Sequence, residues 1–151
     1  MIEIIEYDDQ YAGVFKELNL EWLDHYNVTE DHDLQILDKP RELVLDGGGS
    51  IFLARDNDRV VGTAGISNEG DHVYELIKMC VAKSHQGRGI SRMLIDKCLE
   101  TARLKGARKI FLYSNSQLTI AIGLYKKYGF VHVDASNSPL ASADVKMELV
   151  L

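Results

Sequence analysis

The sequence contains few cysteines and prolines and no long apolar segment. Its 151 residues include two cysteines and two prolines, and no apolar run approaches the roughly 20 residues that a membrane-spanning helix needs. Cys80 and Cys98 lie within apolar patterns and have no Cys or His at a metal-ligand spacing, so we expect reduced core residues. The acidic N-terminus lacks the apolar segment of a signal peptide. We therefore expect a cytoplasmic protein with no metal and no membrane association.

Positive charge is also scarce, and it is unevenly placed. The chain has 17 Lys and Arg against 23 Asp and Glu, a net charge of −6 that argues against nucleic-acid binding. Residues 1–46 hold 13 acidic and three basic side chains, whereas residues 47–151 hold 10 acidic and 14 basic ones. This asymmetry is either uneven surface decoration, or a basic half that receives a phosphorylated ligand and an acidic half that attracts a cation.

The remaining composition is that of an ordinary globular protein, with 46% hydrophobic and 26% charged residues, and the length fits one domain over residues 1–151. Alternation and helical periodicity predict a mixed α/β architecture of about seven strands and four helices. We expect strands near residues 2–7, 51–55, 60–66, 72–81, 109–114, 130–133 and 144–151. We expect helices from residue 8 or 9, from a cap at Thr29, and over about 90–105 and 118–128.

The segment "KSHQGRGISRML" places two glycines directly before a predicted helix. Glycine is favoured where backbone must approach a ligand closely, and a helix N-terminus is a natural anion site. A P-loop would need Lys-Ser/Thr after Gly89, where Ile90 and Ser91 stand. A dinucleotide-binding turn would need a third small residue, where Arg92 stands. Neither of these phosphate motifs fits.

A different motif does fit. The segment "QGRGIS", preceded by "ELIKMCV" and followed by "LYKKYGF", resembles the GCN5-related N-acetyltransferases (GNAT), whose signature is Gln/Arg-x-x-Gly-x-Gly/Ala. Gln86, Gly89 and Ser91 occupy the three signature positions, and Ser91 departs from the usual Gly or Ala. The resemblance is strongest over residues 74–130. It implies a GNAT-like acyl-CoA N-acyltransferase fold, in which the fourth and fifth strands are parallel and splayed.

The resemblance also implies that acetyl-CoA is the cosubstrate and that the glycine turn cradles its pyrophosphate. The predicted cofactor-binding residues of the turn are Gln86, Gly87, Arg88, Gly89, Ile90 and Ser91. Backbone groups of Met79, Cys80 and Val81 are expected to pair with pantetheine amides as an added strand would. Asn115 either contacts the cofactor or, together with Ser116, caps the following helix.

Glu75 is the first candidate catalytic residue. Strict alternation places it on one strand face with apolar residues, and a carboxylate in such a row is costly unless it is paired, wet or functional. Some family members carry a general-base glutamate here, so Glu75 is either that base or a structural carboxylate paired with a cation. Alternation places Lys78 on the opposite face. The apolar residues of the row are Val73, Ile77, Met79 and Val81.

Tyr125 is the second candidate, four residues before Gly129. The family commonly has a tyrosine here that protonates the departing CoA thiolate, and phenols and thiols have comparable ordinary pKa values. The alternative is plain core packing, because Tyr125 belongs to an apolar helical stripe. We expect Tyr128 to be structural and His85 to lie on the surface.

The resemblance implies direct transfer of an acetyl group from acetyl-CoA to a primary amine of a small molecule or peptide, through a ternary complex. The alternative is a non-catalytic acyl-CoA-binding sensor or regulatory module, and a homodimer is left open. Residues 21–33 and 136–144 are expected to shape the acceptor pocket. The acidic first segment predicts that neutral or cationic amines outcompete dicarboxylic amino acids.

Overall fold

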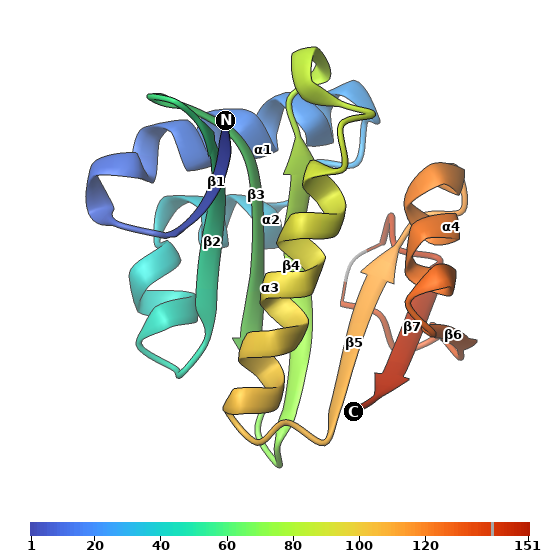
Figure 1. Cartoon of the computed structure of the whole chain (residues 1–151). Coiled ribbons are helices and arrows are strands. Elements are labelled where there is room, and N and C mark those ends of the chain that lie inside the picture. The colour runs from blue at the N-terminus through green and yellow to red at the C-terminus, as the bar shows by residue number, and fades with distance from the viewer. Residues whose placement is uncertain (140) are drawn as a thin grey trace.

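The computed structural model describes residues 1–139 and 141–151 (Figure 1). They form a seven-stranded mixed sheet in the order β1-β2-β3-β4-β5-β7-β6. The strands are β1 (Ile2–Glu6), β2 (Ser50–Asp56), β3 (Arg59–Asn68), β4 (Val73–Val81), β5 (Lys109–Ser114), β6 (Val131–Val133) and β7 (Val145–Val150). The helices are α1 (Ala12–His25), α2 (Asp31–Asp38), α3 (Ile90–Leu104) and α4 (Thr119–Lys127). The expected number and order of strands and α-helices are confirmed.

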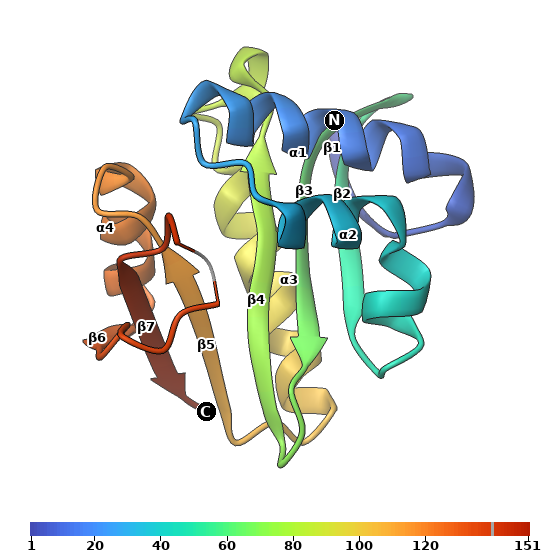
Figure 2. The ribbon, with the colours of Figure 1, turned by 180° about the vertical axis from the view of Figure 1, so that it is seen from behind.

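Helices cover both faces of the sheet. Figures 1 and 2 show α3 across one face, and α1 and α2 across the other. Two apolar clusters fill these layers, one containing the buried residues of α3 and α4 and the other containing those of α1 and α2. β2 and β3, between the two layers, are buried on both faces along most of their length, which explains their continuous apolar character.

Helix α3 shows how the sequence pattern produces the packing. Its buried residues recur at helical spacing, so one face of the helix lies on the sheet while charged residues occupy the other. The helix ends before Gly106, whose φ of +80° is the left-handed conformation that glycine adopts without steric cost. The buried residues are Ile90, Leu94, Ile95, Cys98, Leu99 and Ala102.

The parallel pair β4 and β5 separates along its length. The two strands are in register only where residues 73–75 face residues 109–111, although β4 continues to Val81 and β5 to Ser114. The facing edges beyond Glu75 therefore lack a strand partner. The expected parallel, splayed pair is confirmed, and Figure 1 shows the separation between β4 and β5.

One local expectation near the N-terminus is wrong, and one local element was not expected. Helix α2 begins at Asp31, and the Thr29 hydroxyl does not cap it but donates to the Asp24 carboxylate at 2.6 Å. A π-helical turn over Arg41–Leu45, which the sequence analysis did not predict, follows α2. Local periodicity misses the turn because it is shorter than two helical repeats.

The two cysteines are free and buried, as expected. Burial raises the pKa of Cys80 to about 11 and that of Cys98 to about 12, so both thiols stay protonated and unreactive at neutral pH. Within the described residues, no helix is long and apolar enough to cross a membrane.

Candidate active site

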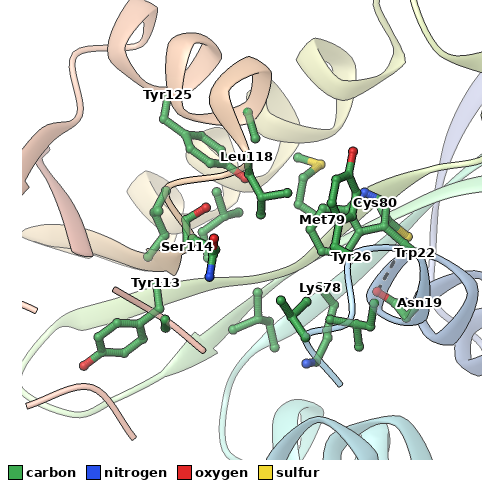
Figure 3. A pocket seen from close by; sticks show the side chains of 18 of the residues that line it. Asn19, Trp22, Tyr26, Lys78, Met79, Cys80, Tyr113, Ser114, Leu118 and Tyr125 are labelled. Atoms are coloured by element: carbon green, nitrogen blue, oxygen red, sulfur yellow. Dashed lines mark hydrogen bonds between the residues drawn. The ribbon is translucent and has the colours of Figure 1, made fainter. Parts of the chain in front are cut away.

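A cavity of about 500 Å³ opens between the splayed strands (Figure 3). It extends from the end of α1, across β4 and β5, to the glycine turn and α4. The structure brings nine of the twelve predicted site residues together around it: Glu75, Met79, Cys80, Val81, Gln86, Gly87, Ser91, Asn115 and Tyr125. Arg88 and Gly89 are exposed beside it, and the Ile90 side chain is buried in the core, so only the backbone of Ile90 is available to a ligand.

The glycine turn has the geometry of an anion cradle. Gly87 and Gly89 have φ of +78° and +79°, and a Cβ at either position would meet no heavy atom within 4 Å. Gly89 caps α3 without a side-chain hydrogen bond, and within the described residues no acceptor is recorded for the N–H groups of residues 87–91. The Gln86 side chain donates to the Val81 carbonyl at 3.2 Å and fixes the turn to β4. Open space and free donors at a helix N-terminus therefore fit a phosphate.

A β-bulge in β4 changes which side chains face the cavity. After Ile77 the register with β3 shifts, and Lys78 adopts the left-handed conformation with φ of +53°. Ile77 packs in the α1 and α2 cluster, whereas Met79 and Val81 pack against the α3 cluster. The prediction that Glu75 shares one face with both Met79 and Val81 is therefore wrong, because the inserted residue reverses the alternation.

Buried polar groups support this bulge. The Thr63 hydroxyl donates to the Lys78 carbonyl at 2.6 Å, and the Asn19 amide donates to Thr63 Oγ1 at 3.1 Å and to the Phe15 carbonyl at 2.8 Å. The Cys80 thiol donates to Asn19 Oδ1 at 3.6 Å, a contact drawn as a dashed line in Figure 3. The Lys78 carbonyl at the bulge thus has a hydrogen-bond partner, which offsets the energetic cost of the distortion.

Glu75 is a partly buried carboxylate with no recorded hydrogen bond or ion pair in the part of the chain that the structure describes. Burial raises its pKa to about 7; Glu69 adds to this effect, while Lys78 and Lys146 oppose it. A carboxylate with such a pKa can hold or release a proton near neutral pH. No ion pair among the described residues supports the alternative that Glu75 is a structural carboxylate.

Tyr125 is buried in the core and also lines the cavity. Its ring is buried and packs on Phe130, with 5.8 Å between centroids, while Figure 3 shows its hydroxyl directed into the cavity beside Leu118. No hydrogen bond of this hydroxyl is recorded among the described residues. Burial raises its pKa, with a smaller contribution from Cys98, so the phenol stays protonated and is a weaker acid than in water.

Tyr128 is structural, as expected. Its hydroxyl donates to Asp96 Oδ1 at 2.7 Å and so joins α4 to α3. Burial, followed by this hydrogen bond, raises its pKa to about 12.

Comparison with known proteins shows which family the chain belongs to. The sequence model of the Acetyltransferase (GNAT) family matches residues 11–130. The chain belongs to the GNAT acetyltransferase family. A curated relative, the uncharacterised N-acetyltransferase YjgM of Escherichia coli, is 26% identical over 147 residues, covering 92% of this chain and 85% of that protein. Other curated relatives are longer proteins, of which the chain matches about a third to a half.

Solved GNAT structures share the whole fold. A GNAT acetyltransferase from Staphylococcus aureus superposes with a TM-score of 0.92 at 26% identity, covering 100% of this chain and 99% of that one. The PaiA N-acetyltransferase of Thermoplasma acidophilum, solved in complex with coenzyme A, has a TM-score of 0.78 at 16% identity, with 100% and 99% covered. The latter likeness shows the fold alone.

In this GNAT chain Asn115 does not cap α4. Its amide donates to the Ser142 carbonyl at 2.5 Å, and its Oδ1 accepts the Gln117 N–H at 3.0 Å. Ser116 instead binds Asp144, with its N–H 2.8 Å from Oδ1. Asn115 lines the cavity, but these contacts occupy both ends of its side chain. The interpretation of Asn115 and Ser116 as a helix cap is therefore wrong.

Hydrogen bonds between distant segments join residues 26–30 to residues 117 and 141–142. The Glu30 carboxylate accepts the N–H groups of Ala141 and Ser142, each at 3.0 Å, and also the Ser142 hydroxyl. These bonds lower the pKa of Glu30. The Gln117 amide donates to the Tyr26 carbonyl at 3.3 Å. Local sequence patterns could not reveal these bonds, because they join residues 91 to 112 positions apart.

Lys78 and Asp33 form an ion pair at the cavity wall, and their side chains are 9% and 5% exposed. Lys78 thus turns to the face that α2 covers, and the prediction that it lies opposite Glu75 is wrong. The bulge is the reason, because it redirects the residue that follows Ile77. The expectation that His85 is exposed is also wrong: it is 8% exposed, and its Nε2 lies 2.9 Å from Asp56 Oδ2.

The acidic first segment contributes little to the cavity wall. Of its 13 carboxylates, Asp33 alone lines the cavity in the described structure, and Lys78 neutralises it. The net charge of residues 1–46 therefore gives little support to the predicted preference for neutral or cationic amines, because most of these carboxylates are exposed and do not line the cavity.

Proposed function

We propose that this protein transfers the acetyl group of acetyl-CoA to a primary amine by direct attack within a ternary complex. The observation that carries the proposal is an unpaired carboxylate, Glu75, in the same cavity as the Tyr125 hydroxyl and the glycine turn. Such a cavity offers a proton acceptor, a proton donor and an anion cradle, which are the three groups that amine acetylation by a CoA thioester requires.

The glycine turn and β4 are the parts that would hold acetyl-CoA. The free N–H groups of residues 87–91 would bind the pyrophosphate, and the unpaired edge of β4 at Met79, Cys80 and Val81 would pair with the pantetheine amides. When bound, acetyl-CoA supplies an activated acetyl thioester. The glycines leave open space for it, which is why a side chain at Gly87 or Gly89 would obstruct the phosphates.

Glu75 and Tyr125 would move the two protons of the reaction. An amine is nucleophilic only when neutral, so Glu75 accepts its proton, directly or through water, as the new C–N bond forms. The C–S bond breaks, and Tyr125 gives its proton to the leaving thiolate. Burial holds Tyr125 in the protonated form that this donation requires, and the products are an N-acetylamine and free CoA.

Release of free CoA thiol on mixing acetyl-CoA with a panel of amines and short peptides tests the proposal. We expect amine-dependent release above background hydrolysis, together with a higher melting temperature in acetyl-CoA, since a ligand that binds only the native state stabilises it. Stabilisation without thiol release from any amine would instead favour the non-catalytic acyl-CoA-binding module.

A further inference from the structure

The charged side chains around the cavity constrain the acceptor amine. Over residues 1–139 and 141–151, the lining includes one Lys or Arg, Lys78, and two carboxylates, Glu75 and Asp33. His32 also lines the cavity, but it is exposed, so water screens its charge. A carboxylate on the acceptor would therefore depend on Lys78 for a buried cationic partner.

Lys78 is not available for that role. Asp33 already neutralises it, and the Asp33 carboxylate also accepts the Glu30 N–H at 3.1 Å. Both side chains of the pair are almost completely buried. A substrate carboxylate that took Lys78 would leave Asp33 buried without its cation, which is strongly unfavourable. Glu75, when ionised, would repel the same carboxylate.

The rest of the acceptor side is apolar. Trp22 and Tyr26 at the end of α1 lie with their ring centroids 5.0 Å apart, and Val28 and Ile36 line the cavity near them. Figure 3 shows Trp22 and Tyr26 together, on the side of Met79 and away from Tyr113. Such a wall favours a flat or branched hydrocarbon group by burying it from water.

We infer that the acceptor is a primary amine with an apolar or aromatic substituent and without a carboxylate beside the amine, and that the Asp33–Lys78 pair enforces the second condition. This inference rests on the proposed acetyl transfer. Asp33 acts as a specificity-determining residue because it cancels the one buried cation that an amino-acid carboxylate could use.

Phenethylamine and phenylalanine form a matched pair of probes, because they differ by one carboxylate. We expect kcat/KM for phenethylamine to exceed that for phenylalanine by about 30-fold or more at pH 8. Phenethylamine is the more basic amine, so its larger protonated fraction works against this preference and cannot produce it. Equal values, or a preference for phenylalanine or aspartate, would overturn the inference. Turnover of spermidine without turnover of phenethylamine would overturn its apolar part.

The variant Asp33→Asn tests the role of the ion pair. It frees Lys78, so we expect kcat/KM for phenylalanine to rise and the preference for phenethylamine to fall about tenfold. The double variant D33N/K78M lacks the cation and should not gain activity on phenylalanine. Asp38→Asn is the control, since Asp38 is an exposed carboxylate of the same helix, paired with Lys16, and its removal should leave the preference unchanged.

The possible results distinguish a failure of this inference from a failure of the proposed acetyl transfer. A rise in phenylalanine activity in the double variant as large as in Asp33→Asn would show that loosening of the wall, and not the freed cation, sets the preference. Should Asp33→Asn fail to fold, the wild-type comparison of the two probes still decides the substrate class. If no amine releases thiol although acetyl-CoA raises the melting temperature, the proposed acetyl transfer itself is refuted.

Discussion

Replacing Glu75 by glutamine should stabilise the protein at high pH while it removes the proposed proton acceptor. The wild-type carboxyl has a pKa raised from 4.5 to about 7, so the native state binds its proton more tightly than the unfolded state does. Below pH 4.5 both states are protonated and the group costs nothing. As the pH rises through 7 the buried carboxylate ionises, and this part of the stability is lost.

The size of the effect follows from the two pKa values. Each unit of pKa corresponds to about 1.4 kcal/mol, so Glu75 lowers the free energy of unfolding by about 3 kcal/mol at pH 8.5. At pH 4.5 the same bookkeeping gives less than about 0.5 kcal/mol. Because glutamine does not ionise, Glu75→Gln should be about 3 kcal/mol more stable than wild type at pH 8.5, and nearly equal to it at pH 4.5.

Urea unfolding of wild type and variant at the two pH values measures this difference directly. In a thermal scan at pH 8.5 the gain should appear as a rise in Tm of about 6–12 °C. Glu17→Gln, a change at an exposed position of α1, is the control and should shift stability by less than about 0.5 kcal/mol at either pH. A Glu75→Gln effect of the same size at pH 4.5 and pH 8.5 would refute the argument from burial.

Three further predictions concern Tyr125, the glycine turn and the bulge in β4. Tyr125→Phe should lower turnover about 10²–10⁴-fold with little change in the Kd of acetyl-CoA, whereas Tyr128→Phe should keep turnover. Full activity in Tyr125→Phe would show that Tyr125 serves only in core packing. Gly87→Ala and Gly106→Ala should each lower the free energy of unfolding in urea by about 1–2 kcal/mol, because both positions have positive φ. Only Gly87→Ala should weaken acetyl-CoA binding in calorimetry, and equal affinities of the two variants for acetyl-CoA would argue against the cradle. Thr63→Val should cost about 1–3 kcal/mol by leaving the carbonyl at the bulge without its donor, and an unchanged free energy of unfolding would show that the bulge does not depend on Thr63.

The activity defect of Glu75→Gln should shrink as the pH rises, whereas its gain in stability should grow. Near pH 7 thiol release should fall by about 10²–10⁴-fold, and the defect should shrink as the pH rises and more of the amine is already neutral. A defect of constant size across the pH range would instead indicate that Glu75 positions the acceptor without taking its proton.

The sequence could predict the features that depend on local spacing. The glycine turn and the α3 stripe follow from residues close together in the chain. The motif around Gln86 and Gly89 indicates the family, and the resemblance to that family implies the parallel, splayed β4 and β5 pair. Glu75 could be singled out because it interrupts an apolar row with a group that can hold a proton. Tyr125 could be singled out because it stands four residues before Gly129, where the family commonly has a tyrosine.

The wrong predictions share a physical cause. Alternation assumes a regular strand, and the bulge at Lys78 reverses the faces beyond it. That bulge is stabilised by Thr63 and Asn19, which lie far from it in the sequence and carry no local signal of the contact. The Asp33–Lys78 pair and the burial of His85 against Asp56 likewise arise from tertiary contacts. Net charge over 46 residues could not show which carboxylates face the cavity.

The bonds from Glu30 to residues 141 and 142 have a consequence for how new specificities arise on this fold. Most of the proposed cofactor side of the cavity comes from one continuous stretch, residues 79–91, whereas the proposed acceptor side is assembled from segments of the N-terminal and C-terminal parts of the chain. If the proposed function holds, substitutions in these segments should alter substrate choice without disturbing the proposed phosphate cradle. Because Glu30 couples those segments, exchanging one of them for that of another GNAT protein should require its partner to be exchanged as well.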